Sequence, residues 1–523
     1  MKKKISPKNK NYYEKILPEI DNLKKNGLIN SYIGSKGYSI YKISLNEKII
    51  DFIKKELTIK PFIPGSLIEP NSFPIYLESE KKIYVPRFWG INIFGYPKIL
   101  KIKIGKSINL KFNGELRDYQ KTVMESYLKA IKFGSKEEEN SEGSALIELY
   151  AGAGKTVLGL KIIQVLRKKT IIFVHKTFLK NQWIERIKQY LPDAKIGIIQ
   201  GQIIDIEDKD IVIAMIQSIS MKSYPDSLFD DFGFCCFDEC HHISSETFSN
   251  CLRKCTTLYS LGLSATMNRK DGLTHVFKMY LGDICNKLKK KAEEDNVLVK
   301  AIDYVVLDDE DYNEVERDYR GNVKHTTMLS RVSNFNYRTD FIINVIENEL
   351  KINKEQHIIL LGHQKNLLNY IYKAVELKNL TSVGYYIGGM KEKDLKISES
   401  KQLILATYAM AAEGLDIPSL TTLILATPKS DIVQSVGRIL REKHSNPLII
   451  DIIDQHDCFL NQFNKRKKFY NEKNYKIIRT NNDKYIEYIK HIKKGEEFNE
   501  QEIWKDVVLK SKKSKEAQCL IKI

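Results

Sequence analysis

The segment AGAGKT, at positions 151 to 156, has the residue types of a phosphate-binding loop. Small residues let successive backbone N–H groups turn towards phosphate oxygens, and the amphipathic stretch that follows would add the partial positive charge of a helix amino terminus. We expect Lys155 to reach the β and γ phosphates of ATP and the hydroxyl of Thr156 to ligate Mg²⁺. Leu149 stands where the full consensus has its first glycine, but the mechanism needs only the tight loop. That loop is assigned to Gly152, Ala153 and Gly154.

Two adjacent carboxylates, Asp238 and Glu239, follow the apolar run GFCCF at 233 to 237. A phosphate loop needs a second acid on the metal side, at the end of a neighbouring parallel strand. We therefore expect Asp238 to hold Mg²⁺ and Glu239 to polarise the attacking water. Adjacent acids after a strand are commonly solvated loop residues, but the position of this strand downstream of the loop favours the catalytic interpretation.

Short apolar runs alternate with longer amphipathic ones from about residue 144, which predicts an α/β domain. Apolar residues recur at intervals of three and four in 155–169 and 178–191, as they do on helices. Apolar runs separated by helices indicate a parallel sheet covered on both faces. The pattern restarts near residue 356, so we expect two such domains. The predicted strands are 144–150, 170–175, 210–215, 233–238 and 259–264 in the first, and 356–362, 383–387, 402–407, 421–427 and 447–452 in the second.

Three further segments flank or separate these domains. Residues 1–110, rich in Gly, Pro, Tyr and Ile, predict a small amino-terminal domain of short strands and turns that could bind nucleic acid. Residues 286–335 pass from the basic NKLKKK to the acidic LDDEDYNEVERD; we interpret them as a linker with an insertion, although a solvated helix face explains the charges equally well. The α/β domains then occupy 111–285 and 336–460, and a basic extension occupies 461–523.

The chain has 523 residues and a formal net charge of +18, and its basic excess lies at the two ends. Residues 1–110 hold 21 basic and 9 acidic side chains, and residues 461–523 hold 17 and 9. Such flanks attract a polyanion such as nucleic acid, although lysine-rich surfaces also serve solubility alone. Aromatic residues interleave with the basic ones in the last segment, where base stacking is one explanation and ordinary packing the favoured one. They are Phe463, Phe469, Tyr470, Tyr475, Tyr485 and Tyr488.

No apolar run reaches the roughly 20 residues of a membrane-spanning helix, and the basic start MKKKISPKNKNYY lacks the apolar stretch of a signal peptide. We therefore expect no membrane association and no secretion. Eight cysteines are too few and too irregular for a disulfide framework, which favours a reducing compartment. A zinc site is the alternative for the cysteines and histidines between 235 and 255, but they include no CxxC and overlap the acidic motif. The cluster consists of Cys235, Cys236, Cys240, His241, His242, Cys251 and Cys255.

Six motifs along the chain resemble, in order and spacing, those of superfamily 2 helicases and translocases of the DExH type. They are LRDYQ (116–120), AGAGKT (151–156), DECH (238–241), SAT (264–266), ATYAMAAEGLDIP (406–418) and QSVGRILR (434–441). The continuation SATMNRKDGL is similar to the XPB-like DNA translocases, the poxvirus transcript-release helicases and their relatives in other large cytoplasmic DNA viruses. The resemblance spans about residues 111–460 and implies two tandem RecA-like domains.

The resemblance also implies roles for residues of the first domain. Gln120, with Arg117 nearby, would read the adenine. His241 would link the state of the nucleotide to the domain interface. Ser264 and Thr266 would couple hydrolysis to movement.

Further roles follow for nucleic-acid contact and for the second domain. Thr177 and Gln182, in the segment HKTFLKNQW, would contact the nucleic acid in the first domain, as Thr407 would in the second. Arg438 and Arg441 would face the γ phosphate across a cleft. Arginines three apart on a helix share a face, and guanidinium groups that arrive from another domain make hydrolysis conditional on closure. The other residues that would approach the nucleotide are Gly414, Asp416 and Gln434.

The resulting hypothesis is an ATP-driven, nucleic-acid-dependent motor that uses ATP and Mg²⁺. The XPB-like continuation favours a translocase on double-stranded DNA that works with transcription, by displacing an RNA polymerase or freeing a transcript. The likeness implies a cytoplasmic viral setting, in a viral factory or a virion. Two alternatives stay open: an RNA helicase of the same superfamily, and a nucleotide-operated switch that binds nucleic acid with little motor activity.

Overall fold

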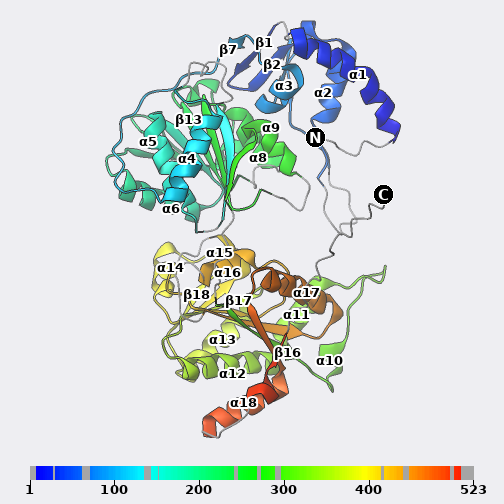
Figure 1. The fold of residues 1–523 in the computed structure, drawn as a ribbon, viewed down its shortest axis with the longest axis vertical. Helices are drawn as coiled ribbons and strands as arrows, with labels where there is room; N and C mark the ends of the chain where they lie inside the picture. Colours follow the sequence, from blue (N-terminus) through cyan, green and yellow to red (C-terminus); the bar gives the residue numbers. More distant parts are fainter. Residues whose placement is uncertain are drawn as a thin grey trace, which may run out of the picture. The chain divides into compact units, whose positions relative to one another are not determined.

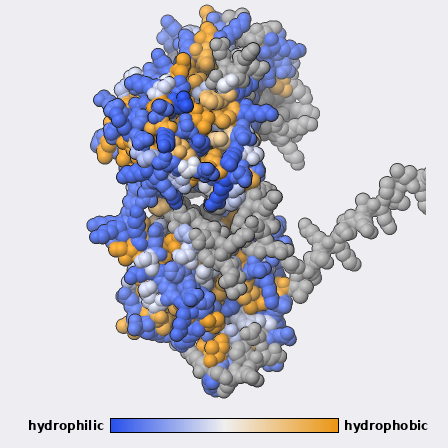
Figure 2. Space-filling model, turned by 60° about the vertical axis from the view of Figure 1, so that its left-hand side comes forward, coloured by the Kyte–Doolittle hydropathy of each residue, from blue (hydrophilic) through white to orange (hydrophobic). Residues whose placement is uncertain are grey.

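The computed structural model describes residues 7–26, 30–61, 71–134, 143–150, 152–240, 246–267, 273–288, 296–413, 417–439, 447–494 and 500–507. The chain divides into two compact units, Met1–Lys290 and Lys291–Ile523. Among the residues coloured by hydropathy in Figure 2, hydrophilic ones predominate on the visible face of each unit, with smaller apolar patches among them. No helix within these described ranges is long and apolar enough to cross a membrane.

The first unit contains an eight-stranded sheet of the order β11-β10-β12-β9-β13-β14-β8-β15. Its strands are β8 (Ser144–Leu149), β9 (Thr170–Val174), β10 (Ile196–Gln200), β11 (Ile203–Asp205), β12 (Ile211–Met215), β13 (Phe234–Asp238), β14 (Tyr259–Ser264) and β15 (Ile284–Leu288). Every pair is parallel except β10 with β11. All five strands predicted for this domain are present, as β8, β9, β12, β13 and β14.

Helices cover both faces of this sheet, as parallel pairing requires. They are α4 (Asp118–Ala130), α5 (Lys155–Leu166), α6 (Thr177–Tyr190), α7 (Ile216–Met221), α8 (Glu246–Lys254) and α9 (Thr274–Leu281). In Figure 1, α4, α5 and α6 lie on one side of the sheet and α8 and α9 on the other. Alternate side chains of β9 enter the two cores: Ile172 packs with α5 and α6, and Ile171 packs with α7 and α8. In the sequence, this arrangement was indicated by strand segments that are apolar throughout, with no alternation of polar and apolar residues.

The amino-terminal part of the first unit has a separate sheet of short strands, in the order β5-β6-β2-β1-β7. These are β1 (Ser31–Gly34), β2 (Gly37–Tyr41), β5 (Leu77–Glu78), β6 (Lys82–Val85) and β7 (Ile99–Leu100); β3 (Thr58–Ile59) pairs with β4 (Phe73–Pro74) apart from them. The helices are α1 (Pro7–Asn26), α2 (Glu47–Glu56) and α3 (Arg87–Phe94). One face of the sheet packs on these helices. Arg87 joins this part to the α/β sheet, because its Nη1 donates to the carbonyl of Thr257 at 3.3 Å.

The second unit contains another eight-stranded sheet, ordered β18-β19-β17-β20-β21-β16-β22-β23. Its strands are β16 (Leu298–Tyr304), β17 (Ile358–Gly362), β18 (Val383–Tyr386), β19 (Leu403–Thr407), β20 (Thr422–Leu425), β21 (Leu448–Asp454), β22 (Lys476–Asn481) and β23 (Lys505–Asp506). Only β22 with β23 is antiparallel among the described pairs. The helices are α10 (Glu310–Asn313), α11 (His325–Asn334), α12 (Asn336–Ile352), α13 (Lys365–Leu377), α14 (Glu392–Glu399), α15 (Tyr408–Glu413), α16 (Val433–Ile439), α17 (Asp457–Glu472), α18 (Asn482–Lys494) and α19 (Glu500–Ile503). The five strands predicted here are β17 to β21.

The prediction of a linker at 286–335 is wrong for most of that segment. β16 lies inside the second sheet, where it pairs in parallel with both β21 and β22. Its charged residues are matched within the fold: Lys300 lies 2.6 Å from a Glu349 carboxylate, and Arg479 makes two 2.8 Å bonds to Asp303. A strand with such residues does not resemble a buried strand when its sequence is taken alone.

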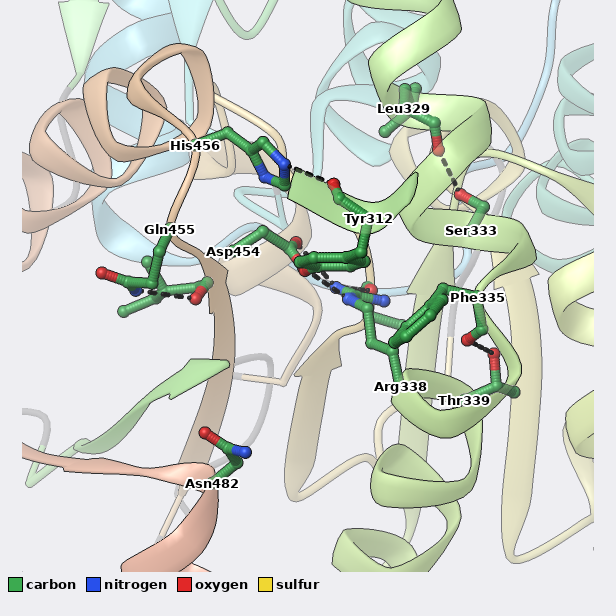
Figure 3. Close-up of polar contacts among 12 residues, drawn as sticks. Tyr312, Leu329, Ser333, Phe335, Arg338, Thr339, Asp454, Gln455, His456 and Asn482 are labelled. Carbon is green, nitrogen blue, oxygen red and sulfur yellow. Dashed lines mark hydrogen bonds and ion pairs between the residues drawn. The ribbon is translucent and has the colours of Figure 1, made fainter. Parts of the chain in front are cut away.

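A buried polar network fixes the rest of this segment to the second sheet (Figure 3). Arg338, on α12, donates to both carboxylate oxygens of Asp454 at the end of β21, at 2.5 and 2.9 Å. The hydroxyl of Tyr312 donates to the same carboxylate at 2.6 Å, and His456 Nε2 lies 2.8 Å from the Tyr312 carbonyl oxygen. Arg338 and Asp454 are fully buried. Residues on either side of the expected domain boundary therefore form one core.

The expected extension at 461–523 also belongs largely to the second domain. α17 begins before it, and β22 and β23 within it continue the sheet. Arg466, a basic residue of this segment, is buried and forms a two-bonded ion pair with Asp451 on β21. Five of the aromatic side chains of this segment are buried in the core, so base stacking is the wrong explanation for them. They are Phe463, Tyr470, Tyr475, Tyr485 and Tyr488. Phe469 packs partly buried against the same core.

The zinc alternative finds no support in the described residues, where no group of His, Cys, Asp and Glu has a metal-binding arrangement. Cys235, Cys236, Cys251 and Cys255 are buried among apolar neighbours. His241 and His242 lie outside the described residues.

Candidate active site

The predicted phosphate loop joins the carboxyl end of β8 to the amino terminus of α5. Gly152 and Gly154 have φ angles of +85° and +74°, in the left-handed region that favours glycine. A Cβ atom on Gly154 would lie 2.5 Å from Nε2 of Gln120, so a larger residue there would also displace the end of that side chain. Ala151 lies outside the described residues. The loop thus has the strand-loop-helix setting and the glycine geometry that the sequence predicted.

Gln120 is buried beneath this loop and is bonded to it. Its Nε2 lies 3.1 Å from the Ala153 carbonyl oxygen and 3.3 Å from that of Gly154. Its Oε1 accepts from the backbone N–H of Arg117 at 3.0 Å. Tyr119, which the motif analysis did not single out, also donates to the Ala153 carbonyl, at 3.2 Å. Gln120 therefore supports the loop directly, while adenine recognition by Gln120 and Arg117 stays a prediction.

Lys155 meets the predicted catalytic acid. Its Nζ lies 2.8 Å from Oε1 of Glu239, which follows β13, and both side chains are largely buried. Glu239 has a φ of +49°, a conformation uncommon for a residue with a side chain. Its other carboxylate oxygen lies 3.4 Å from the Ser264 hydroxyl, at the end of β14. Neighbouring strands β13, β14 and β8 thus bring the predicted amine, acid and coupling serine to one edge of the sheet.

Asp238 is held in place by two hydrogen bonds from the protein. Its Oδ2 accepts from the indole N–H of Trp183 at 2.9 Å, and its Oδ1 accepts from the backbone N–H of Glu239 at 3.0 Å. Burial, followed by the charge of Glu239, raises the pKa of Asp238 to about 6, while Lys155 opposes the shift. The carboxylate is therefore ionised at neutral pH and available to a cation.

Comparisons with known proteins identify the family of the chain. The model of the family described as "Type III restriction enzyme, res subunit" matches residues 113–269. A protein of Acanthamoeba polyphaga mimivirus, named as an ATP-dependent RNA helicase, is 32% identical over 94% of this chain and 95% of its own length. The DNA 3'-5' translocase XPB2 of Sulfurisphaera tokodaii is 27% identical over 65% of this chain and 81% of its own. The chain belongs to the same family of ATP-dependent helicases as the mimivirus protein. Among solved structures, S. cerevisiae Dbp5 bound to RNA and ADP BeF3 covers 72% of this chain and 97% of its own, with 14% identity and a TM-score of 0.47.

Trp183 is a second residue of this helicase site that motif reasoning missed. It is fully buried, comes from α6 and reaches under α5. Gly159 of α5 makes the space, because a Cβ atom there would lie 2.9 Å from the Trp183 ring. The only sequence signal was a tryptophan next to Gln182, on a helix that also carries the predicted nucleic-acid contacts.

Ser264 and Thr266 of the helicase form a compact turn after β14. The Ser264 hydroxyl donates to the Thr266 carbonyl at 2.6 Å and accepts from the Thr266 backbone N–H at 3.1 Å. Thr177 begins α6 and is exposed, and Gln182 is half-buried on the same helix. His241, the fourth residue of the DECH motif, lies outside the described residues. Coupling and nucleic-acid contact by these residues stay predictions.

In the second unit of the helicase, Thr407 ends β19 beside the end of β17. His363, which follows β17, lies with Nδ1 2.7 Å from Thr427 Oγ1 and its ring 4.6 Å from that of Tyr408. Burial, followed by the charge of Lys429, lowers the pKa of His363 to about 4, so it is neutral at neutral pH. Gln434 and Arg438 belong to α16, with side chains that are not described. Gly414, Asp416 and Arg441 lie outside the described residues.

The side chains of the first unit fit ATP and Mg²⁺. A carboxylate and a hydroxyl are oxygen donors of the kind Mg²⁺ prefers, and Asp238 and Thr156 supply them next to a glycine-rich loop at a helix amino terminus. Thr156 is partly exposed on the first turn of α5. These two residues would hold the metal, and Lys155 would meet the phosphates.

Proposed function

We propose that this ATP-hydrolysing helicase is a motor that moves along nucleic acid, with double-stranded DNA as its track, and that it acts during transcription. The observation that carries the proposal is the pairing of Lys155 with Glu239 at 2.8 Å, beside the buried carboxylate of Asp238. Phosphoryl transfer from ATP requires an amine that meets the phosphates, an acid that holds the metal and an acid that accepts a proton from the attacking water. Side chains of these three types lie at one edge of this sheet.

The chemical roles follow from these positions. Bound Mg²⁺ would neutralise charge on the transferred phosphoryl group. The loop N–H groups and Lys155 would orient the triphosphate, and Asp238 with Thr156 would hold the metal. Lys155 must leave Glu239 to meet a phosphate, and Glu239 then has a carboxylate oxygen with which to accept a proton from water. The ion pair therefore links binding of the triphosphate to release of the catalytic acid.

Movement requires that the second domain respond to the nucleotide. We assign this to Arg438 and Arg441, which would complete charge neutralisation only when the domains close. Thr177 with Gln182 and Thr407 would hold the strand on the two domains, so alternate closing and opening would advance the protein. The residues that would relay the nucleotide state are His241, Ser264, Thr266, Gly414, Asp416 and Gln434.

The choice of DNA and of transcription rests on likeness. The continuation SATMNRKDGL resembles XPB-like DNA translocases, and one relative is named as a DNA translocase. Another relative is named as an RNA helicase, which makes RNA the alternative track. RNA polymerase is the proposed partner, and the cytoplasm of an infected cell is the proposed setting.

The deciding experiment is the steady-state ATPase rate of the full chain without polynucleotide, with duplex DNA, with single-stranded DNA and with RNA. A DNA motor predicts marked stimulation by duplex DNA, and Lys155→Ala should lower the stimulated rate by about 10²-fold or more. Stimulation by RNA alone would make the protein an RNA helicase. Equal rates in all conditions would favour the nucleotide-operated switch. Displacement of a triplex-forming strand from duplex DNA separates translocation from mere stimulation.

A further inference from the structure

We propose that the outer face of the amino-terminal sheet binds a single-stranded polynucleotide, with bases stacked on tyrosines and phosphates paired with lysines. This inference rests on the proposed function, because it supplies a second hold on nucleic acid away from the ATP site. The face, called here the Tyr/Lys face, is made by eight residues. They are Tyr32, Ser39, Tyr41, Leu77, Lys82, Tyr84, Ile99 and Lys101, of which Ser39 is itself buried.

Strand register puts these residues on one side of the sheet. Tyr32 is opposite Ser39, and Ser39 is opposite Tyr84, so one row crosses β1, β2 and β6. Tyr41 is opposite Lys82 in the next row. Tyr32 and Tyr84 are separated by one strand, which places their backbones about 10 Å apart. Two such rings could receive bases that are not stacked on each other.

The opposite side of the sheet forms the core of this part. Ile33, Tyr38, Ile40 and Ile83, which alternate with the residues of the Tyr/Lys face, are buried against the helices. In Figure 1, α1, α2 and α3 gather on one side of β1 and β2. The three tyrosines of the Tyr/Lys face are only half-buried. A sheet that packs one face on a core usually exposes polar side chains on its other face. Here the exposed face carries tyrosine rings.

Lysines lie directly over these rings. Lys82 Nζ is 4.5 Å from the Tyr41 ring centre and 5.2 Å from that of Tyr32, and Lys101 Nζ is 4.6 Å from the Tyr32 ring. The Lys82 ammonium also donates to the Tyr32 hydroxyl at 3.2 Å. Such contacts hold flexible cations beside aromatic surfaces. A phosphate could attract the lysines off the rings and leave the rings to bases.

The charge of the surroundings favours a polyanion. None of the eight residues is acidic, and the neighbouring Glu78 pairs with Lys42 and Lys54, at 2.7 and 2.8 Å. The face adjoins a hollow of about 200 Å³ between this sheet and α8, and no acidic residue is among those described around it. Lys36, Arg253 and Lys254 add positive charge there. A basic groove with aromatic platforms is the recurring design of single-strand binding, because every base has a ring face.

The test measures binding of labelled dT20, U20 and a 20-base-pair duplex to the full chain by fluorescence anisotropy. Tyr32→Ala with Tyr84→Ala should raise the dissociation constant for dT20 or U20 about tenfold, as loss of two stacking sites predicts. Tyr32→Phe with Tyr84→Phe keeps the rings and should stay within about twofold of wild type. Tyr337→Ala, at an exposed tyrosine on α12, is the matched control. Duplex binding should change less, because its bases are enclosed.

The lysines have their own readout. Lys82→Gln with Lys101→Gln should flatten the dependence of single-strand affinity on salt, by about 0.7 in logarithmic slope for each phosphate that the protein no longer neutralises. Crosslinking with iodouracil-substituted dT20 should place the oligonucleotide on peptides that contain Tyr32 or Tyr84. The strand, dT20 or U20, that wild type binds more tightly identifies the natural ligand as DNA or RNA.

The possible failures are distinguishable. If wild type binds single strands and is stimulated by a polynucleotide, but both alanine substitutions leave binding unchanged, the Tyr/Lys face is not a nucleic-acid site and the proposed function stands. A lack of crosslinks to these peptides would overturn the face in the same way. If no polynucleotide binds or stimulates the wild-type chain, both proposals are wrong.

Discussion

The indole N–H of Trp183 donates a 2.9 Å hydrogen bond to Oδ2 of Asp238, the acid proposed to hold Mg²⁺. Trp183 follows Gln182 on α6, the helix proposed to contact nucleic acid. If α6 shifts when it contacts nucleic acid, the indole N–H of Trp183 that orients Asp238 moves with it. This places a direct mechanical connection between the two proposed sites within the first domain.

Trp183→Phe should weaken metal use while it preserves the fold. Phenylalanine keeps an aromatic side chain, although a smaller one than the indole, and it removes a hydrogen bond to a charged group, which is worth about 1.5–3 kcal/mol. We expect the Mg²⁺ concentration for half-maximal ATPase to rise about tenfold, with a smaller change in maximal rate. Trp89→Phe, in the amino-terminal core, is the control and should leave the Mg²⁺ dependence unchanged. The same Mg²⁺ dependence in Trp183→Phe and wild type would refute the positioning role.

Glu239→Gln should separate nucleotide binding from hydrolysis. The amide cannot accept the proton of water, and it no longer forms an ion pair with Lys155, so the amine is easier to recruit to a phosphate. We expect ATP affinity equal to or above that of wild type, with the hydrolysis rate reduced by about 10²-fold or more. Titration calorimetry and a phosphate-release assay measure the two quantities. A parallel loss of binding would show that Glu239 serves the loop and not the reaction.

The pH dependence follows from the raised pKa of Asp238, about 6. An unfolded aspartate has a pKa of about 3.9, so between these values the folded state holds a proton that the unfolded state has released. The Asp238 contribution to the free energy of unfolding therefore falls as pH rises from about 4 to 6 and is constant above that.

Metal binding needs the carboxylate of Asp238, so Mg²⁺ should compete with the proton. At limiting Mg²⁺ the acid limb of the ATPase profile should lie near pH 6 and should move to lower pH as Mg²⁺ is raised. An acid limb independent of Mg²⁺ would contradict this assignment.

Removal of the carboxyl-terminal segment should disrupt the second domain. A chain that ends at Leu460 lacks most of α17 and all of β22, and it leaves Asp451 buried without Arg466. Breaking a buried ion pair alone costs about 3–5 kcal/mol. We expect loss of cooperative unfolding of this domain in thermal circular dichroism. A chain that ends at Val507 keeps every described element and should unfold as the full chain does. Equal transitions for both shortened chains would restore the interpretation of a separate tail.

Predictions from the sequence succeeded where local composition carries the information. Apolar runs such as DIVIAM, at 210–215, predicted strands because a strand buried on both faces has few polar positions. The phosphate loop and the acids could be proposed because their chemistry requires particular residue types at fixed spacing, and their roles stay predictions. The geometry of Gly154 and the distance between Lys155 and Glu239 agree with that reasoning.

The failures involve partners that are distant in the chain. β16 was missed because Lys300 and Asp303 look like surface residues until Glu349 and Arg479 are seen beside them. The pairing of Trp183 with Asp238 depends on where α6 packs, which no local pattern states. The basic character of the last segment suggested a nucleic-acid tail, although Arg466 neutralises a buried acid.

The position of β16 has a consequence for how the protein is made. Leu298 begins a strand whose neighbours begin at Leu448 and Lys476, so a ribosome must add well over a hundred residues before either neighbour exists. During synthesis this strand has two open edges, and such edges promote aggregation. The second domain can complete its sheet only after Asp506 has been synthesised, whereas every described strand of the first sheet is already available by Leu288.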